Sequence, residues 1–255
     1  MSALARNESL LGLLPIIGLL LVWQAAVSAG VAPAALLPSP VAVFGRVAQN
    51  LVDADFLRNT WVTLYRLFTG FLLALAIGVP LGLAGATNRI VGAVLKPLVR
   101  VLAPVPKIAL YPALILSLGF DDASKIVLVT ADALFPILLA TFGGAAMVEP
   151  KLVWSARAAG TSPAGTLLKV ILPATLPSIL TGSRIALVVS CIVVFLAEMI
   201  TSTDGLGYML VRASRNFQTV DMFVPLIAIS VIGLLLNGAL AYARRKLLVG
   251  FPEED

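Results

Sequence analysis

Histidine is absent from this 255-residue chain, and cysteine occurs once, at Cys191 within an apolar run. Without histidine, metal binding and imidazole acid–base catalysis lose the side chain that most often performs them. A single cysteine excludes a disulfide within the chain. The sequence therefore predicts neither a metal site nor a disulfide scaffold.

Sequence motifs for nucleotide binding and hydrolysis are absent as well. The G-x-x-x-x-G-K-[ST] loop that surrounds nucleotide phosphates does not occur, so we do not expect the chain to bind ATP in the usual way. Neither the H-E-x-x-H helix of zinc proteases nor the G-x-S-x-G elbow of hydrolases is present. We predict that the chain has no catalytic residues, is not an enzyme and holds no cofactor of its own.

Charge is also scarce. Charged residues make up 12% of the chain and hydrophobic residues 60%, against roughly 25% and 45–50% in globular proteins. Most of the surface therefore cannot face water, and the chain is predicted to be an integral membrane protein. The net charge of +5 comes from basic residues scattered between apolar runs. That spacing indicates membrane topology rather than a nucleic-acid-binding stripe.

The apolar runs predict an all-α membrane protein in one domain, 1–255, with six transmembrane helices. The first span covers about 9–30, and a Pro-rich, amphipathic stretch to residue 59 is expected to lie at the membrane interface. Prolines at 104, 106 and 112 predict a bent third span, buried in protein and ending near residue 119. The other spans are expected at about 60–86, 124–147, 178–203 and 222–242, so that the core spans run from about 60 to 243.

Small residues recur within the second predicted span, where Gly78 and Gly82 form a small-xxx-small pair. Such pairs let membrane helices approach closely. Either a neighbouring helix of the same chain or a second subunit satisfies this pattern, and we favour the intramolecular contact.

Basic residues set the predicted orientation. Eight Lys and Arg residues lie on one side of the six-span arrangement and five on the other. The positive-inside rule puts the richer side, and with it both termini, in the cytoplasm. The polar interval 149–177 then also faces the cytoplasm.

Several ionisable residues interrupt the apolar runs, and each is a functional candidate by default. Arg66, Lys107 and Arg184 lie near span ends, so the favoured interpretation is that they reach to an interface. Asp132 lies deeper and is expected to pair with Arg66 if their helices touch, whereas Glu198 is either a rim charge or a gate residue. The predicted pathway residues are Arg66, Asp132, Ser190 and Glu198.

The interval 149–177 is the longest polar break in the second half of the chain. A short helix over 151–159 is predicted to stop at Gly160, which most easily takes the left-handed conformation. A second helix begins at Pro163, after a Thr-Ser pair suited to capping. Pro173 then marks the return to the membrane.

This interval resembles a known loop. Gly160, nine residues, and then Val170-Ile171-Leu172-Pro173 match the G-x9-I-x-L-P part of the EAA loop of bacterial ABC importer permeases. Trp154-Ser155-Ala156 stands where that family usually has Glu-Ala-Ala, so only the last residue agrees. The runs 66–82, 172–187 and 196–199 resemble the subgroup that serves nitrate, sulfonates and taurine.

The resemblance implies a type I ABC importer permease fold in the bacterial inner membrane, with 149–177 as a cytoplasmic coupling loop. It also implies a homodimer of permeases, two ABC ATPase subunits that hold ATP and Mg²⁺, and an extracytoplasmic solute-binding protein. The residues expected to contact the ATPase are Leu152, Val153, Trp154, Ala156, Arg157, Ala159, Gly160 and Pro173.

The same resemblance implies a small anion such as a sulfonate, taurine or nitrate as the solute, with a thiamine-precursor pyrimidine or bicarbonate as alternatives. Two other classes are weighed against a permease. A membrane-embedded enzyme would have to use Asp132, Arg66 and Cys191, which lie far apart in sequence. A passive channel gives no reason for a stiff helix-Gly-helix loop. Co-purification with a separate ATPase discriminates among the three classes.

Overall fold

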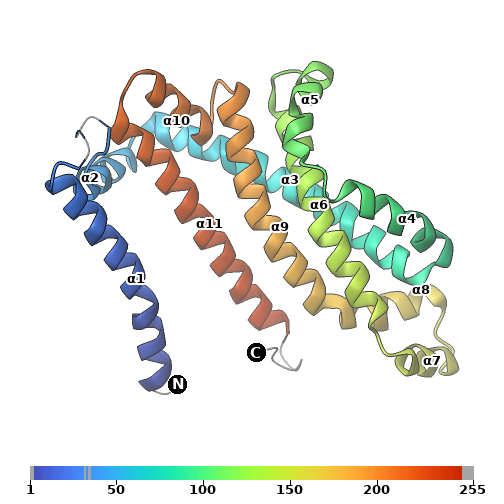
Figure 1. The fold of residues 1–255 in the computed structure, drawn as a ribbon. Helices are drawn as coiled ribbons and strands as arrows, with labels where there is room; N and C mark the ends of the chain where they lie inside the picture. Colours follow the sequence, from blue (N-terminus) through green and yellow to red (C-terminus); the bar gives the residue numbers. More distant parts are fainter. Residues whose placement is uncertain (1–2, 32, 34–35, 249–255) are drawn as a thin grey trace.

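The computed structural model describes residues 3–31, 33 and 36–248, and this part of the chain is helical, without a strand. In Figure 1 the long helices α6, α9 and α11 run side by side, α3 crosses behind them, and α1 stands at the edge. In chain order the elements are α1 (Ala3–Ser28), α2 (Pro40–Asn50), α3 (Ala54–Thr87), α4 (Arg89–Leu102), the 3₁₀ turn η1 (Lys107–Leu110), α5 (Tyr111–Leu118), α6 (Asp122–Ala146), α7 (Pro150–Ala158), α8 (Pro163–Thr166), the π turn η2 (Leu167–Ile171), α9 (Leu172–Thr201), α10 (Leu206–Arg215) and α11 (Thr219–Leu247).

Helices α3 and α9 both pack against α6, and small residues allow the close approach. A Cβ added at Gly82 of α3 would lie 2.7 Å from the Cβ of Thr141, and one at Gly78 would lie 3.0 Å from a methyl of Ile137. Gly182 of α9 is equally close to α6. The predicted intramolecular contact of Gly78 and Gly82 is therefore confirmed.

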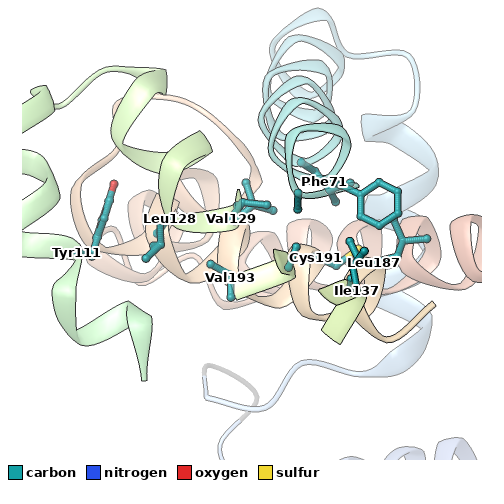
Figure 2. Close-up of a cluster of buried hydrophobic side chains, with 14 of the residues drawn as sticks. Phe71, Tyr111, Leu128, Val129, Ile137, Leu187, Cys191 and Val193 are labelled. Atoms are coloured by element: carbon teal, nitrogen blue, oxygen red, sulfur yellow. The ribbon is translucent and has the colours of Figure 1, made fainter. Parts of the chain in front are cut away.

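The apolar core lies where these three helices meet, and Cys191 is buried within it. Figure 2 shows side chains of α3, α6 and α9 converging there, with the Tyr111 ring of α5 at one edge. The core residues labelled in the figure are Phe71, Tyr111, Leu128, Val129, Ile137, Leu187, Cys191 and Val193. Because lipid is as apolar as these side chains, tight packing rather than hydrophobic burial stabilises such a contact.

Four helical segments are long and apolar enough to cross a membrane: α3, α6, the continuous run 163–201 and α11. Helix α4 and the η1–α5 segment after it are long and apolar enough to cross a membrane only when taken as one pair, and that pair is bent by 82°. Helix α1 contributes a shorter apolar stretch, Leu14–Ser28. The described residues thus contain four spans, or five with the bent pair, and the sixth depends on α1.

The bent pair confirms the predicted break in the third span, but its predicted burial is wrong for the single chain. Leu116 of α5 is 89% exposed, and Val101 of α4 is 68% exposed. Tyr111 and Ile115 do reach the core. One face of this segment packs on the bundle, and the other is apolar and uncovered.

Two helices extend beyond the predicted spans. Helix α3 begins at Ala54, capped by the Asp53 side chain, before the predicted span start at about residue 60. The helix that begins at Pro163 continues through η2 into α9, as far as Thr201. The π turn explains this continuity, because the Leu172 amide bonds to the Leu167 carbonyl one residue further back than in an α-helix.

The two ends of the bundle carry different elements (Figure 1). Helices α2 and α10 and the turn between α5 and α6 lie at one end, called the α10 end below. Helix α7, the start of α1 and the end of α11 lie at the other, called the α7 end. Helix α2 falls within the stretch predicted to be interfacial, and Arg46 ties it to α11 through an ion pair with Asp221.

Candidate functional site

A buried ion cluster lies at the α10 end, around Arg66 of α3. This residue is only 2% exposed. Its Nε donates to Asp122 Oδ1 of α6 at 2.6 Å, and its Nη1 donates to Glu198 Oε1 of α9 at 2.9 Å. Its Nη2 donates to Asp204 in the loop that precedes α10. One guanidinium therefore joins α3, α6, α9 and that loop.

The carboxylate of Glu198, itself 1% exposed, is fixed by further donors. The Thr63 hydroxyl lies 2.9 Å from Oε2, and the Gly207 amide donates to the same oxygen at 3.0 Å. The Thr63 oxygen also accepts the Leu206 amide at 2.9 Å. Because each polar group has a partner, the cluster avoids the penalty of an unpaired buried charge.

The loop between α9 and α10 fits against this cluster only because glycine stands at Gly205. Its φ of +97° lies in the region that side chains disfavour, and an added Cβ would lie 2.3 Å from Glu198 Cδ. The Gly205 amide donates to Asn59 Oδ1 at 2.7 Å. The loop is thus bonded directly to α3.

Asp132 does not pair with Arg66 as expected. Asp132 lies 3.7 Å from Lys107 Nζ instead. The reason is helical rise: Asp132 is ten residues beyond Asp122 on α6, about 15 Å along the axis. Arg66 meets the first acidic residue of α6 and is out of reach of the second.

The remaining polar candidates lie apart from the cluster. Ser190 is fully buried, and its hydroxyl donates to the Ala186 carbonyl of its own helix at 2.8 Å. Arg184 is exposed on α9 and donates to Asn237 Oδ1 of α11 at 2.7 Å. Of the four predicted pathway residues, the structure brings together only Arg66 and Glu198.

Sequence reasoning missed the partners of the cluster, which are Asn59, Thr63, Asp122, Asp204, Gly205 and Gly207. The sequence did contain one signal. Asp204 and Gly205 follow an apolar run that contains Glu198, at a point where the chain must turn. The pattern does not reveal that this turn folds back onto α3.

At the α7 end, the interval between α6 and α9 has the predicted helix-Gly-helix geometry. Gly160 has φ +80°, its amide bonds to the Arg157 carbonyl, and the Thr161 amide bonds to the Ala156 carbonyl. These two hydrogen bonds form the Schellman motif that ends a helix. Ser162 then caps α8 by accepting the Gly165 amide.

Most of α7 projects from the bundle, and none of its residues is buried. Trp154 is 65% exposed and Leu152 is 50% exposed, while Ala156 is half-buried. Val153 packs toward a small apolar cluster that includes Ile171. Arg157, Ala159 and Gly160 are exposed, whereas Pro173 is half-buried in the first turn of α9.

Together, this geometry defines a multi-pass helical membrane protein with a projecting helix between two of its spans. The fold matches that of a chain of the MetNI methionine ABC transporter, solved in inward-facing conformations, with a TM-score of 0.65 and 21% identity over 75% of this chain and 95% of that one. Residues 78–249 match the family described as binding-protein-dependent transport system inner membrane component. The chain belongs to that family.

Curated relatives resemble nearly the whole chain. The putative aliphatic sulfonates transport permease protein SsuC of Bacillus subtilis is 34% identical over 92% of this chain and 85% of its own length. The taurine transport system permease protein TauC of Escherichia coli is 30% identical over 90% of this chain and 85% of its own length. These relatives are named as transport permeases rather than as enzymes.

Proposed function

We propose that this chain is the permease subunit of an ATP-driven importer for small sulfonates, taurine included. The observation that carries the proposal is the α7–Gly160–α8 segment. It is exposed, turns sharply at Gly160 and is continuous with a helix long and apolar enough to cross a membrane. The names of the relatives support the solute class.

The proposed mechanism depends on a rigid connection between α7 and the helix 163–201. Helix α7 would fit a groove on an ATPase subunit, which binds the ATP and Mg²⁺. When two such subunits close on ATP, α7 moves with them. The Schellman bonds at Gly160 and the unbroken helix 163–201 would carry that movement to the α10 end as alternating access. A second copy of this chain would complete the pathway, and an external binding protein would deliver the solute.

Charge supports an orientation with the α7 end in the cytoplasm. The basic residues at that end include Lys151, Arg157, Lys169, Arg244, Arg245 and Lys246. Those at the α10 end are Arg46, Arg58, Arg66, Lys125, Arg212 and Arg215. Arg66 is buried in the ion cluster, and Lys125 is buried with its ammonium donating to the carbonyls of Phe120 and Asp121. Four exposed basic residues therefore remain at the α10 end. The positive-inside rule favours this assignment.

Co-expression with a candidate ATPase and binding protein tests the proposal. The full chain should retain the ATPase during purification, and proteoliposomes of the complex should take up labelled taurine only with ATP and the binding protein. Uptake without ATP would indicate a channel. A chain that modifies the solute without an ATPase would be an enzyme, and either result would refute the proposal.

Variants of Gly160 test the coupling role of the segment. Gly160→Val places a β-branched residue at φ +80°, which should redirect α7 and uncouple ATP hydrolysis from uptake. Gly160→Asn is the matched control, because asparagine tolerates this conformation. Trp154→Ala should weaken retention of the ATPase, since the ring is exposed. Unchanged coupling in Gly160→Val would exclude the segment as the transmission element.

A further inference from the structure

A small cavity of about 180 Å³ opens at the α10 end, between the last turn of α9 and helix α10. It is smaller than the roughly 300–1,000 Å³ of sites for drug-sized ligands. Its polar lining residues are Glu198, Ser202, Tyr208, Arg212, Arg215 and Asn216. The cavity therefore suits a small and polar occupant.

Electrostatics make this cavity cationic. Glu198, its acidic lining residue, is already paired with Arg66 inside the bundle. Arg212 pairs with Asp55 at 3.0 Å, and that hydrogen bond raises the pKa of Arg212. Arg215 is exposed and forms no ion pair with any residue that the structure describes. One arginine charge thus faces the cavity without a counterion.

The neutral polar groups complement that charge. Tyr208 lies under Arg212, with the guanidinium carbon 5.7 Å from the ring centre, which restrains the arginine. Asn216 adds a side-chain amide, whereas the Ser202 hydroxyl already donates to Asp204 Oδ1 at 3.4 Å. Guanidinium and amide donors around a small cavity are groups that bind an oxyanion.

We propose that this cavity binds the anionic head group of a small organic sulfonate, with Arg215 as its main charge partner. The assignment rests on the proposed function, because the α10 end must face the side from which solute arrives. An occupant would also lie next to the buried ion cluster, since the Ser202 hydroxyl is 3.3 Å from Arg66 Nη1. Solute in the cavity would therefore contact Ser202 and Glu198, which both accept hydrogen bonds from Arg66.

The binding test uses the full chain in lipid nanodiscs, titrated calorimetrically with methanesulfonate. Dimethyl sulfone is the control ligand, because it has a similar shape without the charge. Methanesulfonate should bind saturably and dimethyl sulfone should not. Arg215→Gln should weaken methanesulfonate binding about tenfold or more, the effect of losing one charge-assisted contact.

The matched control is Arg58→Gln, an exposed arginine at the same end that does not line the cavity. It should bind methanesulfonate like the parent. Arg215→Lys keeps the charge and should retain most of the affinity, which separates charge loss from misfolding. Equal weakening in Arg58→Gln would reduce the effect to general surface charge and overturn the proposal.

Failure of this site is distinguishable from failure of the proposed function. If the assembled complex takes up taurine but the chain shows no saturable methanesulfonate binding, or Arg215→Gln binds normally, the cavity assignment falls and the importer assignment stands. If Arg215→Gln binds methanesulfonate normally but loses capture of the binding protein, the arginine belongs to a docking surface. If the chain binds methanesulfonate but the complex transports no sulfonate, the proposed function fails instead.

Discussion

Arg66 is the residue on which the α10 end depends, because its guanidinium is shared by carboxylates from three other segments. Replacing it with Leu leaves Glu198 charged, 1% exposed and without its cation. Removing one partner of a buried pair typically costs about 3–5 kcal/mol. We expect Arg66→Leu to lower the melting temperature of the purified chain sharply.

Arg46→Gln is the control for this variant. It removes an arginine from the ion pair with Asp221, in which both side chains are partly exposed. Such pairs contribute about 0–1 kcal/mol, so the melting temperature should change little. Equal melting temperatures of Arg66→Leu and Arg46→Gln would show that the buried cluster does not stabilise the fold.

Gly205 is a second critical residue, and Gly119 provides its control. Both have positive φ values, +97° and +85°, with ψ near 180°, so alanine strains the backbone at each, by roughly 1–3 kcal/mol. Only at Gly205 would the new Cβ also meet the Glu198 carboxyl. Gly205→Ala should therefore destabilise the purified chain clearly more than Gly119→Ala in thermal unfolding. Equal losses would mean that the loop moves aside without consequence.

At the scale of elements, the bent segment of η1 and α5 is attached to α6 through a charge pair. Lys107 Nζ lies 3.7 Å from Asp132, donates to the Ala103 carbonyl at 2.9 Å and sits over the Phe135 ring. Both side chains are largely buried. This pair therefore fixes the break in the third span against its neighbour.

Lys107→Met and Asp132→Leu should each destabilise the chain, because each leaves the other charge unpaired at membrane depth. The double variant should be more stable than the sum of the single losses predicts, and a double-mutant cycle on melting free energies measures this coupling. Strict additivity would show that the two charges act independently and that water or lipid solvates each of them.

At the scale of the whole molecule, the arrangement of helices predicts opposite accessibility for two exposed positions. Ala123 lies at the start of α6, at the α10 end, and Ser155 lies on the projecting helix α7. In a Cys191→Ala background, Ala123→Cys should react with an impermeant thiol reagent on intact cells. Ser155→Cys should react only after the membrane is opened, and the reverse pattern would invert the proposed orientation.

The sequence by itself determined the membrane class, the approximate positions of the long helices and the helix-Gly-helix form around Gly160. Those features are local: runs of apolar residues specify spans, and a glycine followed by Ser162 and Pro163 specifies where one helix ends and the next begins. The tertiary structure decided which charges meet. Arg66 and Glu198 are 132 residues apart, and their contact depends on how α3 and α9 pack against α6. The same packing, and the 15 Å or so of helical rise between Asp122 and Asp132, gave Asp132 a lysine partner that no local pattern indicates.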